Sequence, residues 1–66
     1  MKLKYNKKTN RYNNFHCGDI FQIMINNKFE VVRIEFFKND WYVINEKGFI
    51  EYCKLLEGKE IKEYEM

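Results

Sequence analysis

Alternating hydrophobic and polar residues mark two neighbouring segments in the middle of the chain, residues 19–25 and 29–37. A period of two is the signature of a β-strand that buries one face, so both segments are predicted to be strands. Asn26 and Asn27 lie between them and predict a tight hairpin, because asparagine tolerates the positive φ angles of such turns. The apolar face of the two strands holds Phe21, Ile23, Ile25, Val32, Ile34 and Phe36.

Shorter runs of β-branched and aromatic residues predict further strands at residues 41–44, 49–54 and 60–64, separated by turn-forming Asn, Asp and Gly. At the front of the chain, KLKY and RY flank the turn-like stretch KKTN and favour one more hairpin. The pattern predicts an all-β protein, a small SH3-like barrel of five to six short antiparallel strands. Residues 50–64 leave an alternative open, because their apolar side chains also lie near helical spacing.

The apolar faces of the two long strands are expected to meet at the centre of the core. Trp41 and Tyr42 are adjacent, so their rings point to opposite faces of a strand. We therefore expect one of these two rings in the core and the other at least partly exposed, and the pattern does not distinguish them. The remaining residues of the expected core centre are Phe21, Ile23, Val32, Ile34 and Phe36.

The chain has 66 residues, which predicts one domain covering residues 1–66. A chain this short buries only about 60% of the surface that its unfolded form exposes. Apolar rings and edge strands then stay uncovered, so we expect a homodimer or higher homo-oligomer. The sequence contains no serine, which excludes a Ser-His-Asp catalytic arrangement. We expect no enzymatic activity and no cofactor.

Cys17 and Cys53 lie far apart in a sequence that starts with charged and polar residues rather than the apolar segment of a signal peptide. We expect free, mostly packed thiols and a cytoplasmic location in a bacterial host, with a single disulfide as the alternative. The longest apolar runs are far shorter than a membrane span, so no membrane partner is expected.

The stretch FHCGD at residues 15–19 combines types of residue found in metal sites and thiol enzymes. A zinc site needs three or four ligands, and side chains of adjacent residues on an extended chain point apart. We interpret the stretch as a structural turn without bound metal. In it Gly18 supplies a permissive backbone, Asp19 accepts hydrogen bonds from neighbouring amides, Cys17 is a small apolar filler and His16 caps the loop.

Charge is uneven: residues 1–16 carry five basic residues and no acidic one, and form a basic front hairpin or arm. Such a segment suits phosphate, although lysines also protect the edges of sheets. Arg33 adds a planar guanidinium that can bind phosphate or pair with Glu35, and exposed tyrosines can stack on bases. The candidate ligand-binding residues are Lys4, Lys7, Lys8, Arg11, Arg33, Tyr12 and Tyr42.

A longer pattern runs from His16 to Ile44: HCGD, an alternating strand, a turn, then RIE and DWYV. It resembles a small family of uncharacterised domains found in low-GC Gram-positive bacteria, their phages and mobile elements. The resemblance implies a compact β-barrel and a mobile-element setting, and it implies no activity.

Two functions follow from these observations. The first is a non-catalytic phage or mobile-element protein that counteracts host defence by binding a nucleotide signal or single-stranded nucleic acid. The second is a module or inhibitor that binds a host protein through an aromatic and apolar face.

Overall fold

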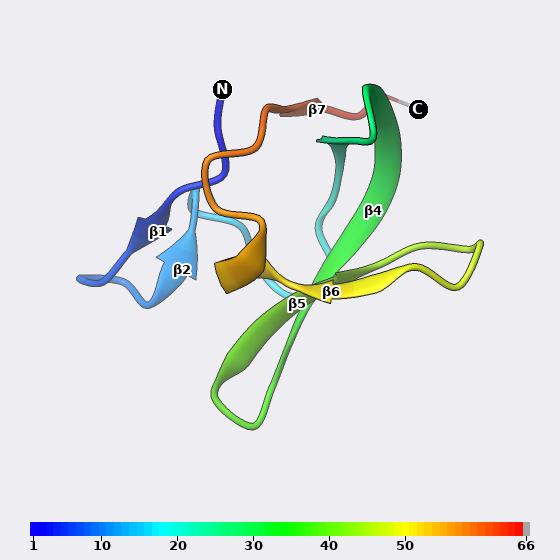
Figure 1. The fold of residues 1–66 in the computed structure, drawn as a ribbon. Coiled ribbons are helices and arrows are strands. Elements are labelled where there is room, and N and C mark those ends of the chain that lie inside the picture. Colours follow the sequence, from blue (N-terminus) through cyan, green and yellow to red (C-terminus); the bar gives the residue numbers. More distant parts are fainter. Residues whose placement is uncertain (66) are drawn as a thin grey trace.

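Seven short β-strands and one turn of 3-10 helix form the regular structure of residues 1–65, the part of the chain that this computed structural model describes (Figure 1). The strands form a five-stranded antiparallel sheet in the order β6-β5-β4-β3-β7 and a two-stranded hairpin, β1-β2. Their bounds are Tyr5–Asn6 for β1, Arg11–Tyr12 for β2, Ile20–Ile25 for β3, Lys28–Phe37 for β4, Asp40–Ile44 for β5, Ile50–Tyr52 for β6, Cys53–Leu55 for the helix η1 and Ile61–Glu63 for β7.

Asparagines make the tight turns. Asn26 and Asn27 join β3 to β4 with φ angles of 51° and 68°, which is the geometry of the two-residue hairpin expected from the sequence. Lys38 and Asn39 join β4 to β5 in the same way. After β5, the Oδ1 atom of Asn45 accepts hydrogen bonds from two backbone amides and holds the turn to β6.

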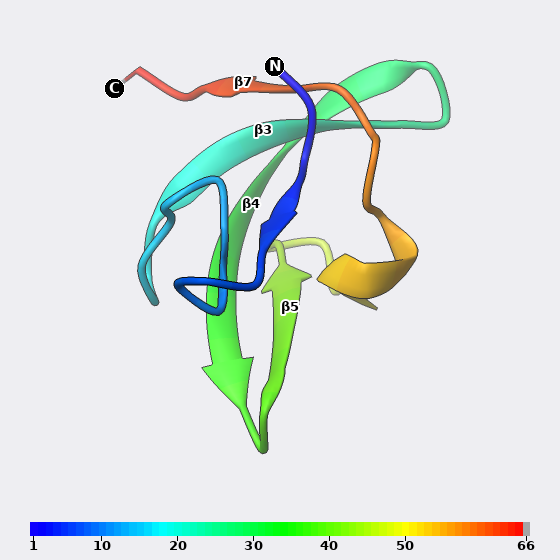
Figure 2. The same ribbon diagram turned by 90° about the vertical axis from the view of Figure 1, so that its left-hand side faces the viewer.

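Strand β4 is shared between two partners. Its first half pairs with β3 and its second half with β5, and Arg33 belongs to both ladders, opposite Ile20 and Ile44. β4 curves along its length and carries its neighbours around a common interior (Figures 1 and 2). We call the concave side the inner face and the opposite side the outer face.

The inner face holds the core. Phe21, Ile23, Val32 and Ile34, all expected there, are at most 1% exposed. Four buried residues come from segments with little or no alternation in sequence and complete this core against the inner face: Leu3, Tyr12, Cys53 and Leu56.

Two details of the expected core are corrected. Phe36 is half-buried rather than central, because β4 is near its end there and the ring packs on Trp41 with centroids 4.8 Å apart. Trp41 and Tyr42 do lie on opposite faces, but both are half-buried. Trp41 lies against the edge of the core and Tyr42 stays on the outer face.

The segment after β6 also differs from both expectations. The strand expected over residues 49–54 is confined to Ile50–Tyr52, and the helical alternative is reduced to one turn, η1. Strand β6 ends at Tyr52, because the chain then turns and directs Cys53 and Leu56 into the core, where both are buried. No helix within residues 1–65 is long and apolar enough to cross a membrane.

The beginning and the end of the described chain are joined side by side. Leu3 donates a backbone hydrogen bond to Lys59 and accepts one from Gly58, and Lys2 bridges Glu60. On its other side, this N-terminal segment is held by Asn13, whose Nδ2 donates to the carbonyl oxygen of Lys2 at 2.8 Å. The segment therefore lies between β7 and the β1-β2 hairpin and covers the open side of the core (Figure 2).

Truncation of Ile34 tests this core. Ile34 is completely buried on β4, so Ile34→Ala should lower the free energy of unfolding by roughly 2–5 kcal/mol and Ile34→Val by roughly 0.5–1.5 kcal/mol. Urea unfolding followed by the fluorescence of Trp41 measures both. Val31→Ala is the matched control, because Val31 lies next along β4 on the outer face and is 40% exposed. An equal loss in Ile34→Ala and Val31→Ala would contradict the assignment of the inner face.

The two thiols should react at very different rates. Cys17 is exposed, whereas Cys53 is buried and burial raises the pKa of its thiol to about 12. Ellman's reagent at pH 8 should therefore titrate one thiol quickly and the second only after denaturation, because the thiolate is the reactive species. Rapid reaction of both thiols in the folded protein would contradict the burial of Cys53.

The same thiol gives a pH dependence of stability. The unfolded chain loses the Cys53 proton around its ordinary pKa of 9.0, whereas the folded chain keeps it up to a pKa of about 12. The unfolded state is therefore favoured increasingly as the pH rises above 9. Urea unfolding from pH 8 to 10 should show a steeper loss of stability in the wild type than in Cys53→Ala.

Candidate functional site

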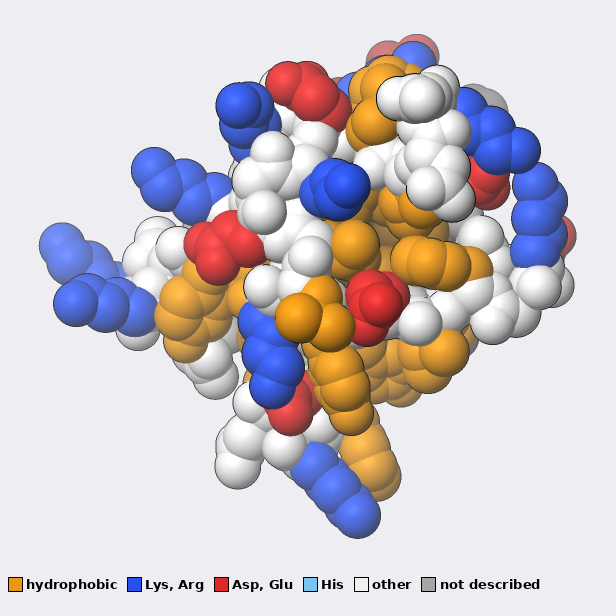
Figure 3. All heavy atoms as spheres, in the orientation of Figure 1, with side chains coloured by type: hydrophobic (Ala, Val, Ile, Leu, Met, Phe, Trp, Pro, Cys, Tyr) orange, Lys and Arg blue, Asp and Glu red, His pale blue; other side chains and the backbone are white. Residues whose placement is uncertain are grey.

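The basic front segment forms a well-defined hairpin, which we call the front hairpin (residues 4–12). Asn6 organises its turn: the Oδ1 atom accepts a hydrogen bond from the amide of Lys8, and the carbonyl oxygen accepts one from the amide of Asn10. The hydroxyl of Tyr5 donates to Asn10 Oδ1 at 2.7 Å and ties the two sides together. Figure 3 shows basic side chains projecting at the left of the view, where Figure 1 places β1 and β2. The basic residues of the hairpin are Lys4, Lys7 and Lys8, which are exposed, and Arg11, which is half-buried.

Tyr12 does not share that surface. Its ring is 6% exposed and packs on Tyr5 with the centroids 5.2 Å apart. Burial, with a smaller contribution from Glu57, raises the pKa of the Tyr12 hydroxyl. The ring therefore belongs to the core, and the expectation that Tyr12 stacks on a base is corrected. The five residues that precede Tyr12, residues 7–11, are exposed or basic, so the sequence pattern did not predict that Tyr12 is buried.

A hollow of about 460 Å³ opens beside the front hairpin, and we call it the front hollow. Trp41 lies on one side of it, and the indole Nε1 donates a hydrogen bond to the carbonyl oxygen of Asn10 at 2.8 Å. That bond fixes the orientation of the ring against the hairpin. The residues that line the hollow are Thr9, Asn10, Arg11, His16, Cys17, Phe36 and Trp41, a set of the described residues that contains no Asp or Glu.

The FHCGD stretch forms the lower rim of this hollow as a hydrogen-bonded turn. Asp19 Oδ2 accepts from the amide of His16 at 2.8 Å, and Gly18 has a φ of +91°. The structural interpretation of Gly18 and Asp19 is confirmed. Cys17, expected as a filler, is instead exposed. His16 and Cys17 line the same hollow because the chain turns here, so the side chains do not alternate as on an extended strand.

Metal-ligating residues are scattered in the described part of the chain. Within residues 1–65, no three His, Cys, Asp or Glu side chains are grouped closely enough to hold an ion. His16 and Cys17 are neighbours, but Cys53 is buried in the core away from them.

Arg33 and Tyr42 lie on the outer face, away from the front hairpin, which packs on the inner face through Tyr12. Arg33 Nε donates to Glu35 Oε2 at 2.7 Å, so its guanidinium is already paired. Apart from Tyr12, which is buried in the core, the candidate residues are therefore divided between two sides of the sheet, with the lysines and Arg11 on one side and Arg33 and Tyr42 on the other.

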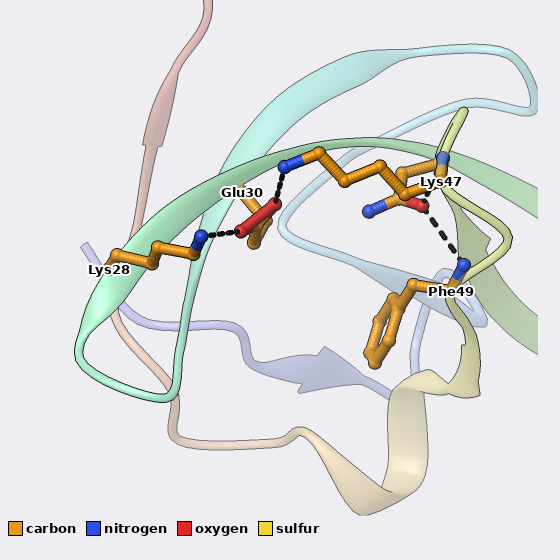
Figure 4. Close-up of polar contacts among 5 residues, drawn as sticks. Lys28, Glu30, Lys47 and Phe49 are labelled. Atoms are coloured by element: carbon orange, nitrogen blue, oxygen red, sulfur yellow. Dashed lines mark hydrogen bonds and ion pairs between the residues drawn. The ribbon is translucent and has the colours of Figure 1, made fainter.

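A second hollow, of about 610 Å³, opens on the sheet where the first half of β4 and the turn after β5 part. We call it the sheet hollow. At its edge, Glu30 Oε1 pairs with Lys28 at 3.3 Å and Glu30 Oε2 with Lys47 at 3.6 Å (Figure 4). Hydrogen bonding to Lys28, helped by Lys47, lowers the pKa of the Glu30 carboxyl. One signal for this pair is visible in the sequence, because Lys28 and Glu30 are two positions apart and so share a strand face.

Comparison with known proteins places the chain without assigning an activity. No curated protein and no solved structure matches it. A family model, described as a domain of unknown function (DUF5348), matches residues 1–62. The resemblance to an uncharacterised domain family is thus confirmed, and the match covers the front hairpin, the front hollow, the sheet hollow except Tyr64, and most of β7. The chain belongs to this family of domains of unknown function, DUF5348.

Proposed function

We propose that this protein is a non-catalytic binder of single-stranded nucleic acid, with the front hollow and the front hairpin as its binding surface. The observation that carries the proposal is the composition of the front hollow. Arg11, His16, Phe36 and Trp41 meet there, and Asp and Glu are absent from its described lining. A basic groove with aromatic side chains is the usual arrangement for holding a strand without reading its sequence.

The chemistry of each part matches a part of a nucleotide. The fixed indole of Trp41 offers a surface on which a base can stack, and its hydrogen bond to Asn10 means that little freedom is lost on binding. Arg11 lies on β2 at the same hollow and can donate several hydrogen bonds to one phosphate. Lys7 and Lys8 lie in the turn beyond the hollow and can reach neighbouring phosphates.

A strand suits this arrangement better than a free nucleotide. Lys7 and Lys8 lie in the turn of the hairpin, outside the lining of the hollow, so the basic surface extends beyond it. A mononucleotide carries its phosphates at one place and would leave those lysines unused. The sheet hollow suits anions less, because Glu30 and Glu46 also line it and Glu30 already binds two lysines.

The proposed biological setting rests on the resemblance seen in the sequence. Its resemblance to domains of phages and mobile elements supports a role in counteracting host defence in the bacterial cytoplasm, where a small protein could sequester nucleic acid. The curved sheet, closed by the N-terminal segment, supports an SH3-like barrel as the finer description of the fold. A host-protein-binding module is the second candidate, and it depends on the outer face.

The binding proposal predicts quenching of Trp41 fluorescence by single strands. Trp41 is the only tryptophan in the sequence, so the signal reports on the front hollow directly. Titration with a dT oligonucleotide should quench it, with log K falling as log salt rises by about 0.7 per phosphate contact. Lys8→Gln should weaken binding and reduce that salt slope by about 0.7, because one contact is lost.

Matched variants separate the hollow from general charge. Arg11→Gln should weaken binding more than Lys47→Gln, which removes the same charge in the turn between β5 and β6. Trp41→Leu removes the aromatic face and should weaken binding about tenfold or more at every salt concentration, since stacking is worth roughly 1–3 kcal/mol per base. Binding of Trp41→Leu is followed by a dye on the oligonucleotide. Equal losses in Lys47→Gln and Arg11→Gln, or no binding tighter than about 100 μM at low salt, would contradict the proposal. Tight binding of adenine or guanine nucleotides without binding of strands would also contradict it.

A further inference from the structure

The outer face of the five-stranded sheet is covered by nothing in the described chain and is largely apolar. In register, Ile20, Arg33, Ile44 and Ile50 form one row across β3, β4, β5 and β6. Side chains directly opposite on antiparallel strands lie about 4.5–5.5 Å apart, so the row is continuous. Ile50 is 64% exposed and Ile20 is 45% exposed, so both side chains present much of their apolar surface to solvent.

The neighbouring row adds aromatic and polar groups. It consists of Glu35, Tyr42 and Tyr52, which pair across β4, β5 and β6. Tyr52 is 47% exposed. Tyrosine and arginine are the types of residue most enriched where protein interfaces carry their binding energy. Figure 2 is viewed from the side of the front hairpin, so this face points away from the hairpin.

Most charges of the outer face balance among themselves. Arg33 and Glu35 form an ion pair in the middle of the two rows. Around the sheet hollow, Lys28 and Lys47 are matched by Glu30 and Glu46. Lys62 on β7 lies in register with Gln22 and over the ring of Phe29, and it adds one basic side chain at the edge of this face. With both signs at its centre and one basic group at its edge, the face repels a copy of itself less than the basic front hairpin would.

The shape of the outer face is also self-complementary. Ile20, Val31, Arg33 and Ile44 line the sheet hollow, and the exposed side chain of Ile50 stands beside Ile44 at its border. A two-fold axis places a projection of one copy opposite a hollow of the other, and the reverse contact follows by symmetry. The hollow and the projection needed for such a contact are both present on this one face.

We infer that the outer face is the contact surface of a homodimer, in which two copies pack around a two-fold axis near Arg33. Ile50 of each copy enters the sheet hollow of the other. Arg33 uses its Nε for Glu35 in its own chain, and its remaining N–H groups bind Glu35 of the second copy. A standard interface buries about 800 Å² per partner, which is roughly one-sixth of the 5005 Å² that this chain exposes. The front hairpins stay free on the far sides of both copies.

Sedimentation equilibrium of the full chain tests the apolar part of this contact. The wild type should form a dimer, twice 8.2 kDa, at tens of micromolar, and Ile50→Lys should shift it to the monomer by at least tenfold in concentration. Leu55→Lys is the matched control: Leu55 is equally exposed, at 65%, but lies on η1 outside both rows and outside the lining of the sheet hollow. Urea unfolding of Ile50→Lys and of the wild type should coincide at a concentration where both are monomeric, which shows that the fold is kept.

Charge reversal tests the polar part and the symmetry. Arg33→Glu and Glu35→Arg should each weaken self-association, because each puts like charges opposite one another across the axis. Mixed together, the two variants should form a heterodimer, since one then presents two acidic and the other two basic side chains at the centre. A contact that does not pair Arg33 with Glu35 between copies gives no such rescue.

Three results would overturn the inference. They are a wild-type monomer at several hundred micromolar, a dimer that Ile50→Lys and Leu55→Lys weaken equally, and variants of Arg33 and Glu35 that fail to combine. A wild-type monomer would indicate that the outer face binds a different protein. Loss of strand binding in Arg11→Gln does not bear on this test, because Arg11 lies on the other side of the sheet.

Discussion

The double pairing of β4 is the constraint on which the rest of the molecule depends. Ten residues are long enough to hold β3 with one half and β5 with the other, and Arg33 takes part in both ladders. The strand curves along its length (Figures 1 and 2), and its concave side is the inner face of the sheet. Val32 and Ile34, on either side of Arg33 in sequence, then face inward and are buried, because side chains alternate. Arg33 itself is directed outward, where its charge can be solvated or paired.

The inner face is too large for the sheet to cover by itself, so the chain covers it with its two ends. Leu3 comes from the N-terminal segment and Tyr12 from the front hairpin, and Cys53, Leu56 and Ile61 come from the segment around η1 and β7. Backbone hydrogen bonds between residues 1–3 and 58–61 close these covers against each other. No comparable cover exists for the outer face within residues 1–65. The two faces therefore differ. The inner face holds the core, and the basic front hairpin packs on it, whereas the outer face can contact a second molecule.

The alternation of apolar and polar residues predicted those features of the fold that depend on neighbouring residues in the sequence. The strands from Phe21 to Ile44, the Asn26-Asn27 turn and four central core residues followed from the period of two and from turn chemistry. Tyr12, Leu3 and Cys53 could not be assigned to the core in that way, because their neighbours are charged and their burial depends on contacts with distant segments. The same limit applied to the candidate site. Basic residues were identified by charge, but only the packing of the hairpin on the inner face separates Arg11 from Arg33. The front hollow combines Arg11, His16 and Trp41 from three separate turns and strands.

Trp41 connects the fold to the proposed binding surface. Its ring packs on Phe36 and against the core, its Nε1 holds the turn of the front hairpin through Asn10, and its remaining surface lines the front hollow. A ring fixed in this way keeps the hairpin in position before any ligand arrives, which limits the entropy that binding must offset. The hairpin alone has only two residues in each strand and would be marginal in water. Its order comes from Tyr12 in the core on one side and from Trp41 on the other. The basic residues can therefore be mobile and solvated at their ends while the backbone that carries them is held rigidly by the same core that curves around β4.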